Sequence, residues 1–271
     1  MSSVVVRRLA ITPVKAMRLL SVERVELEVA GVRLNRRFFW IDDRDRMVNG
    51  KVLGDLQAVV AEYVEQPARR RLSLRFPDGT VVSDELPLRQ GPTVVTRFFS
   101  RLQEGTLVDG PWSSAVSSLV GRPLRLVEAG EWGAVDRGFE GSASLISRAS
   151  LARLGGVGGV DGGIDARRFR MLIEIDGVPA HFEDGWLGRR VRVGGAVVEF
   201  SGHVGRCLIT SRDPDTGTID LPTLDLIGSY RGGLPTTEPL AFGIYGRVIE
   251  PGVVAVGDAV VADSGEAGPL L

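Results

Sequence analysis

The chain has 271 residues, of which 44% are hydrophobic and 25% are charged, and these are ordinary proportions for a globular protein. Its 33 basic and 34 acidic residues leave a net charge of −1, so no overall positive field favours nucleic acid as a partner. No apolar run approaches the roughly 20 residues that span a bilayer, and Arg7 and Arg8 stand where a signal peptide needs its apolar core. We therefore expect a cytoplasmic protein without a membrane partner.

Short apolar stretches separated by 35 glycines and 14 prolines predict many strands and few helices. In the first part of the chain, strands are expected at Val4–Val14, Val22–Val29, Arg37–Asp42, Leu72–Phe76 and Thr80–Ser83. Asp78-Gly79 between the last two is typical of a tight hairpin turn, because these residues accept positive φ angles.

The later part of the chain mixes short helical patterns with further strands. Helices are predicted at Trp112–Val120, Arg148–Leu154 and Leu221–Tyr230, the first two ended by glycine. Strands are predicted at Phe169–Ile175, Arg189–Val193, Ala196–Ser201, Arg206–Ser211, Ile244–Glu250 and Val253–Val256. Gly194-Gly195 indicates a second hairpin, and the last eight residues are expected to fray.

These elements predict a mainly β fold with a few short helices. A weak boundary at Gly91-Pro92 divides the chain into an N-terminal β-barrel-like unit, residues 1–92, and a larger β-barrel domain, residues 93–271. We expect the smaller unit to pack on the larger one.

The sequence does not match several well-known functional motifs. The glycine-rich segment 155–163 does not fit the dinucleotide pattern and follows a helical stretch, so a mobile loop is expected there. The turn at 213–217 lacks the glutamate that closes a calcium loop, and no G-x-S-x-G turn supports a serine hydrolase. One cysteine and two histidines are too few for a disulfide or a structural zinc site. Asp213 is instead expected to brace its own turn.

Cys207 is the candidate reactive residue. Its thiolate would be a nucleophile and a soft-metal ligand, and the adjacent Arg206 favours that form, although a lone cysteine is also often a small buried hydrophobe. Gly202 and Gly205 before it and the turn at 213–217 after it suggest a thiol at a strand start beside a cavity.

Several segments together resemble the MOSC family, which is named for the C-terminal part of molybdenum cofactor sulfurase and includes the amidoxime reducing components. The N-terminal likeness lies at 13–27 and 31–51, and that of the MOSC domain proper lies at 142–154, 167–177, 182–200 and 204–217. The resemblance implies a MOSC-type β-barrel domain preceded by the family's N-terminal β-barrel domain.

The resemblance also implies a molybdenum cofactor (molybdopterin) with Cys207 as the protein ligand to the metal. Thiolate suits the soft, sulfur-bound molybdenum, and the cofactor's phosphate needs cationic groups. Lys15, Arg37, Arg170 and Ser147 match family motifs, and Lys15, Arg37 and Arg170 are expected to converge on one cavity near Cys207. The remaining candidate cofactor-binding residues are Arg18, Asn49, Lys51, Arg168 and Arg206.

The sequence departs from the family pattern at Ala16, Ser144 and Leu172, which removes hydrogen-bonding groups expected around the cofactor. Pyridoxal phosphate is not expected on this chain. By analogy with the family, the chain would be an oxidoreductase for a small N-hydroxylated or oxygenated substrate. It has no nucleotide loop or iron–sulfur cysteine set, so an external electron-transfer partner is expected. The alternatives are a cofactor-independent sulfur carrier with a persulfide on Cys207, or a module that binds or helps synthesise a small molecule.

Overall fold

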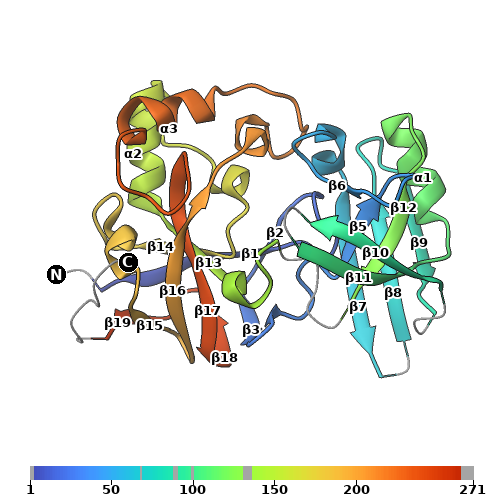
Figure 1. Cartoon of the computed structure of the whole chain (residues 1–271), viewed down its shortest axis with the longest axis horizontal. Helices are drawn as coiled ribbons and strands as arrows, with labels where there is room; N and C mark the ends of the chain where they lie inside the picture. The colour runs from blue at the N-terminus through green and yellow to red at the C-terminus, as the bar shows by residue number, and fades with distance from the viewer. Residues whose placement is uncertain (1–2, 68, 88–90, 99–100, 131–135, 264–271) are drawn as a thin grey trace.

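The computed structural model describes residues 3–67, 69–87, 91–98, 101–130 and 136–263. These residues form a mainly β fold with four sheets and three α-helices, which confirms the predicted fold class. Figure 1 shows two halves side by side, one containing β5 to β12 with α1 and the other containing β13 to β19 with α2 and α3. No helix in the described ranges is long and apolar enough to cross a membrane.

The N-terminal half contains two sheets. The five-stranded sheet has the order β10(Thr93–Phe98), β11(Arg101–Leu107), β12(Arg125–Ala129), β5(Phe38–Ile41), β6(Met47–Val48). The three-stranded sheet has the order β7(Val60–Gln66), β8(Arg69–Arg75), β9(Val81–Glu85). The predicted hairpin is confirmed, since β8 and β9 pair around Gly79, whose φ is 86°. The expected division at residue 92 falls within the five-stranded sheet, because β12 pairs with β5.

Helix α1(Trp112–Val120) has the predicted bounds and ends at Gly121 in the left-handed conformation. Trp112 is fully buried, and its indole N–H donates a 3.0 Å hydrogen bond to the carbonyl of Leu72 on β8. The same core includes Phe38 and Trp40 of β5 and Leu56 of the 3₁₀ turn η1(Gly54–Ala58). This core holds the N-terminal half together through burial of large apolar side chains.

The C-terminal half is built on an eight-stranded sheet that begins with β19(Val260–Ala262), β15(Arg190–Val193), β16(Ala196–Gly205) and β17(Ala241–Glu250). It continues through β13(Ala143–Ser147), β14(Ile173–Asp176), β1(Val5–Ile11) and β2(Leu20–Val22). The predicted hairpin at Gly194-Gly195 is confirmed, since Val193 pairs with Ala196. A second three-stranded sheet contains β18(Gly252–Ala255), β3(Arg24–Glu28) and β4(Gly31–Val32).

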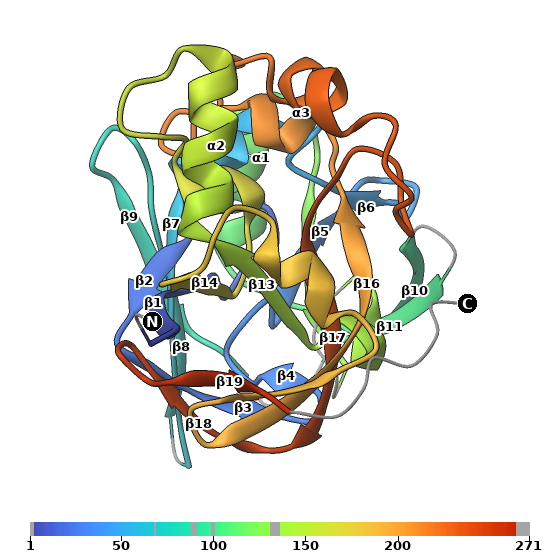
Figure 2. The ribbon, with the colours of Figure 1, turned by 90° about the vertical axis from the view of Figure 1, so that its left-hand side faces the viewer.

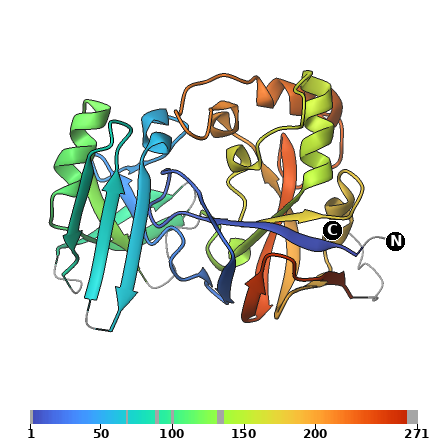
Figure 3. The same ribbon diagram turned by 180° about the vertical axis from the view of Figure 1, so that it is seen from behind.

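The first strands of the chain therefore belong to the sheets of the C-terminal half. β1 pairs with β14 and β3 pairs with β18, so the chain passes from one half into the other after β4. Figure 3 shows β1 crossing the back of the molecule beside β14. Residues 12–19 link β1 to β2 and contribute Val14 and Met17 to the core of the N-terminal half, and residues 33–37 link β4 to β5, so both segments lie between the halves.

Two helices pack together at one end of the C-terminal half, as Figure 2 shows. Helix α2(Arg148–Gly158) is capped by the preceding residue, Ser147, whose side chain accepts a hydrogen bond from the amide of Ser150. Helix α3(Thr223–Arg231) lies beside it. Their shared core contains Leu151, Ile227 and the stacked rings of Phe169 and Phe242.

Three local predictions for this half were wrong. Helix α2 continues past Gly155 to Gly158 and ends at Gly159 with a φ of 65°, so the expected loop at 155–163 begins later. Residues 206–211 form no strand, because the chain leaves β16 at Gly205 and makes the 3₁₀ turn η5(Leu208–Ser211). The strand expected from Phe169 begins only at Ile173, after the 3₁₀ turn η3(Ala166–Phe169). The expected frayed tail, 264–271, lies outside the described residues.

Two further 3₁₀ turns complete the described elements, and both lie near strands of the eight-stranded sheet. They are η2(Gly138–Gly141), which precedes β13 and packs on β17, and η4(Phe182–Trp186), which precedes β15.

Candidate functional site

A cavity of about 500 Å³ lies between the two halves, and Cys207 is one of its lining residues. One wall comes from the first 51 residues and the other from residues 136–245. Its described walls carry six cationic side chains and two carboxylates, a surplus of four positive charges. These residues are Lys15, Arg36, Lys51, Arg137, Arg170, Arg206, Asp136 and Glu238. Such a surplus favours an anionic ligand.

Cys207 lies in the short link between β16 and η5. Its backbone is extended, and its carbonyl accepts a hydrogen bond of 3.0 Å from the amide of Thr210, which starts the 3₁₀ turn. The residue is exposed. A buried hydrophobic role is therefore wrong for this cysteine, and its thiol is available to a ligand in the cavity. The prediction of a cavity beside the thiol is confirmed, although the thiol follows a strand instead of beginning one.

The Arg206 guanidinium is held by backbone carbonyls. It donates 2.8 and 2.9 Å hydrogen bonds to the carbonyls of Phe242 and Phe169, and it lies 5.2 Å from the centre of the Phe169 ring. Burial lowers the pKa of Arg206, and the positive charge of Arg137 adds to this effect. A guanidinium keeps its proton at neutral pH, so Arg206 is a buried positive charge. A bound anion would offset the cost of burying that charge.

Lys15, Arg36 and Arg170 form a second cationic group. Arg36 donates a 3.1 Å hydrogen bond to the backbone carbonyl of Arg170, and the Arg170 side chain donates one of 2.6 Å to the carbonyl of Met17. Arg36 and Arg170 have positive φ angles of 53° and 54°, and Ala16 has one of 75°. Non-glycine residues rarely adopt this conformation, and such strain is typical of functional sites.

Asp136 is the carboxylate that faces this group. Lys15 donates a 2.8 Å hydrogen bond to it, and the Lys15 side chain is 9% exposed. Burial lowers the pKa of Lys15, Asp136 opposes this shift, and Arg36 and Arg170 add to it. Burial also acts to raise the pKa of Asp136, but Lys15 and Arg36 outweigh it, so the pKa lies below its ordinary value. One carboxylate thus faces three cations.

On the wall formed by residues 136–245, Arg137 forms a close ion pair with Glu238 and lies 4.5 Å from the centre of the Tyr245 ring. Burial acts to lower the pKa of Arg137, but the hydrogen bond to Glu238 outweighs it and the pKa is raised. The Glu238 carboxylate also accepts a 3.0 Å hydrogen bond from the amide of Gly205, at the end of β16. This wall therefore supports the chain just before Cys207.

Asn49 and Lys51 also line the cavity, as the sequence suggested. The Asn49 side-chain oxygen is buried without a hydrogen-bond partner among the described residues. Of the positions that depart from the family pattern, Ala16 and Ser144 line the cavity. The Ser144 hydroxyl accepts a 3.0 Å hydrogen bond from the amide of Leu172.

Four of the predicted cofactor-binding residues do not line this cavity. Arg37 binds Glu128 at 2.8 Å in the N-terminal half, and the adjacent Arg36 lines the cavity in its place. Ser147 is fully buried and caps α2. Arg168 binds Asp220, and Arg18 binds the 213–217 loop. The expected convergence on Cys207 therefore holds for Lys15 and Arg170 but is wrong for Arg37.

Sequence reasoning missed Asp136, Arg137, Glu238 and Tyr245 as lining residues. Arg36 was detectable as the neighbour of Arg37, but a sequence pattern cannot show which of two adjacent arginines faces inward. The other four lie outside the motifs, and no spacing signal marks them. Asp213 was expected to brace its turn, and this is confirmed, since its carboxylate accepts hydrogen bonds from the amides of Asp215 and Thr216.

The lining residues fit a molybdenum cofactor in chemical type. An exposed thiol is a ligand for soft molybdenum, a cationic group suits a phosphate, and the unpartnered oxygen of Asn49 suits an N–H donor of a pterin. No group of three or more His, Cys, Asp or Glu residues in the described part of the chain forms a cluster able to hold a metal ion. A metal in this cavity would therefore need ligands from a cofactor besides Cys207.

Two domain families match this chain, one in each half. The MOSC N-terminal beta barrel domain matches residues 3–122, and the MOSC domain matches residues 133–261. Mitochondrial amidoxime-reducing component 1 from Mus musculus is 34% identical over 122 residues, which cover 43% of this chain and 35% of that protein. Mitochondrial amidoxime reducing component 2 from Homo sapiens is 38% identical over 98 residues, which cover 34% of this chain and 29% of that protein.

The matched region thus spans about a third of the length of these relatives. Among solved structures, the YUAD protein from Bacillus subtilis aligns over 98% of both chains with 13% identity and a TM-score of 0.46.

Proposed function

The chain belongs to the MOSC domain family, and we propose that it is a molybdenum-cofactor-dependent oxidoreductase in which Cys207 binds the metal. The observation that carries this proposal is an exposed thiol on a cavity whose described walls have a surplus of positive charge. The matched relatives are named as amidoxime-reducing components, and we propose amidoxime reduction for this chain.

Lys15, Arg36 and Arg170 would hold the cofactor's phosphate, because they form a group that a single carboxylate faces. Asn49 would accept a hydrogen bond from the pterin, and Arg206 would stabilise the thiolate of Cys207. When bound, the cofactor supplies two-electron redox chemistry at an exchangeable oxygen. The chain supplies its position and its charge environment.

The proposed substrate is a small N-hydroxylated compound such as an amidoxime. Its reduction breaks the N–O bond, consumes two electrons and two protons, and yields an amidine and water. The electrons would come from a separate flavin, haem or iron–sulfur protein. A cytoplasmic location stays a prediction.

Metal analysis of protein purified from a host that makes the cofactor tests this proposal. We expect about one molybdenum per chain in the wild type and a strong loss in Cys207→Ser, because a hydroxyl is a poor ligand for a soft metal. Arg190→Ala is the control, since that side chain is exposed on β15 and does not line the cavity.

Mass spectrometry of the same samples tests the sulfur-carrier alternative. Wild-type protein without molybdenum but with an additional sulfur atom on Cys207 would contradict the redox proposal and support persulfide transfer. Wild-type protein with neither molybdenum nor an additional sulfur atom would contradict both proposals. The remaining role for this cavity would be to bind a small ligand.

A further inference from the structure

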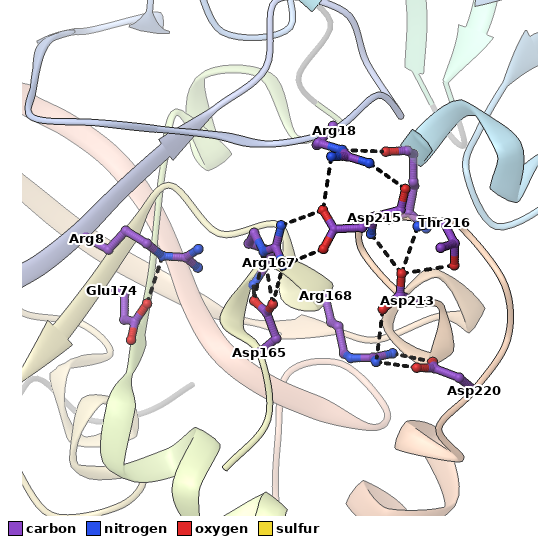
Figure 4. A network of polar contacts seen from close by, with 11 residues as sticks. Arg8, Arg18, Asp165, Arg167, Arg168, Glu174, Asp213, Asp215, Thr216 and Asp220 are labelled. Carbon is purple, nitrogen blue, oxygen red and sulfur yellow. Dashed lines mark hydrogen bonds and ion pairs between the residues drawn. The ribbon is translucent and has the colours of Figure 1, made fainter. Parts of the chain in front are cut away.

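The loop that follows η5 carries a carboxylate bound by two arginines from separate segments, as Figure 4 shows. Asp215 accepts two hydrogen bonds from Arg167, of 2.8 and 2.9 Å, one at each carboxylate oxygen. Arg18 lies 3.2 Å from the same carboxylate and donates a 2.6 Å hydrogen bond to the Asp215 backbone carbonyl. One residue thus joins three segments of the chain.

Each of these three segments also lines the cavity. Arg18 follows Lys15 and Ala16, Arg167 precedes Phe169 and Arg170, and Asp215 follows Cys207 and Ile209. The segments are connected a second time, because Arg170 donates its 2.6 Å hydrogen bond to Met17, the residue before Arg18. A shift at Asp215 would therefore change how the Lys15 wall lies against Arg170 and Cys207.

The loop itself is fixed in place. Asp213 braces it from within, and Arg212 donates hydrogen bonds of 2.6 Å to the carbonyl of Gly217 and 3.1 Å to that of Lys51. Gly217 lies against the backbone of Gly54 so closely that a Cβ atom would be 2.0 Å from the Gly54 carbonyl oxygen. Asp215 is therefore held on a rigid support between the two halves.

We propose that Asp215 is a positioning residue, which sets the spacing of Lys15, Arg170 and Cys207 and thereby the affinity of the cavity for a phosphate-bearing ligand. This role depends on the proposed function only in that the cavity binds a phosphate. The Asp215 side chain is 43% exposed, so its ion pairs contribute little to global stability. Bidentate geometry instead fixes orientation, and supporting contacts of this kind change ligand affinity about 10-fold or more.

The test compares Asp215→Asn with Asp220→Asn. Asp220 is a matched control, because it accepts two hydrogen bonds from Arg168, the neighbour of Arg167, and its side chain is 41% exposed. No described contact joins the Asp220 side chain to Arg18. Metal-free wild type and both variants are titrated with inorganic phosphate by calorimetry. The reaction rate of Cys207 with an anionic aromatic disulfide is then measured for each protein.

We expect Asp215→Asn to weaken phosphate binding about 10-fold and to slow the thiol reaction several-fold, because both depend on cations held near Cys207. Asp220→Asn should stay within about 2-fold of wild type in both measurements. Arg18→Gln combined with Asp215→Asn should lose less affinity than the product of the two single losses, because both changes break the Arg18–Asp215 ion pair. Equal effects of Asp215→Asn and Asp220→Asn would overturn the positioning role.

The two proposals fail in different ways. If the wild type binds no phosphate, the proposed cofactor site is wrong, and the thiol reaction still tests Asp215. If the wild type binds phosphate and Asp215→Asn binds it equally well with an unchanged thiol rate, the cofactor site stands and the positioning role is wrong.

Discussion

Lys15 and Asp136 form a 2.8 Å ion pair although they lie 121 positions apart in the chain. Asp136 is the carboxylate that faces Lys15, Arg36 and Arg170, and its charge opposes the lowering of the Lys15 pKa by burial. The protein therefore carries its own anion where we propose that the cofactor's phosphate binds. Asp136 and a phosphate would compete for the same positive charges.

Asp136→Asn removes this internal anion. We expect the free energy of unfolding to fall by about 1–3 kcal/mol without added anion, because Lys15 then lacks its partner beside two arginines. Inorganic phosphate should bind more tightly than in wild type and restore the lost stability, since a ligand stabilises the folded state that binds it. Thermal unfolding with increasing phosphate measures both effects. Equal phosphate stabilisation of wild type and variant would show that Asp136 does not compete.

Local patterns predicted the fold where neighbouring residues determine it. The bounds of α1 agree because Trp112 and Val116 lie one turn apart and Gly121 ends the helix. The hairpin at Gly79 also agrees, because Asp78 and Gly79 supply the turn chemistry. The segments after Gly205 and Phe169 could not be predicted in this way. Contacts from distant carbonyls hold Arg206 and Arg170 there, and a sequence pattern does not show such contacts.

The candidate site was predictable only in part for the same reason. Motif resemblance located Cys207, Lys15 and Arg170, but it selected Arg37 where Arg36 lines the cavity. The two adjacent arginines diverge because Arg37 binds Glu128, which is 91 positions away. Asp136 lies outside the matched motifs. It faces three cations only because the fold brings Lys15, Arg36 and Arg170 around it.

Cys207→Ser should leave the fold intact. Because the side chain is exposed, we expect the free energy of unfolding to change by less than about 0.5 kcal/mol, while the proposed molybdenum binding and amidoxime reduction are lost. Urea unfolding followed by circular dichroism, together with activity, separates these effects. A large loss of stability would assign Cys207 a structural role.

His181 should make the protein sensitive to mild acid. Burial lowers its pKa to about 4, and the positive charge of Arg231 adds to this effect. Because the unfolded value is near 6.5, the unfolded state binds an extra proton between these values, and stability falls as the pH falls from about 6.5 to 4. One pKa unit corresponds to about 1.4 kcal/mol, and solvent screening at this half-buried ring reduces the effect to about 1–2 kcal/mol.

His181→Asn tests this dependence, since asparagine tolerates the positive φ of 62° found at this position. The variant should lose stability at pH 7, because the 3.1 Å hydrogen bond to Tyr230 is broken, but it should lose less than wild type between pH 7 and 4.5. Urea unfolding at the two pH values gives the comparison. Equal losses in both proteins would assign the acid sensitivity to other groups, of which His203 is the next candidate because burial lowers its pKa also.

The close contact of Gly217 with Gly54 gives a prediction with an internal control. Gly217 and Gly79 have similar φ angles of 76° and 86°, so alanine at either position is strained by about 1–2 kcal/mol. At Gly79 a Cβ atom meets nothing within 4 Å, whereas at Gly217 it would lie 2.0 Å from the Gly54 carbonyl oxygen. Gly217→Ala must therefore also move the loop away from η1, and we expect it to cost about 2 kcal/mol more than Gly79→Ala. Since Arg212 connects this loop to Lys51 on the cavity wall, Gly217→Ala should also weaken phosphate binding, and Gly79→Ala should not. Equal stability of the two variants in urea unfolding would show that the contact with Gly54 relaxes freely and does not hold the loop.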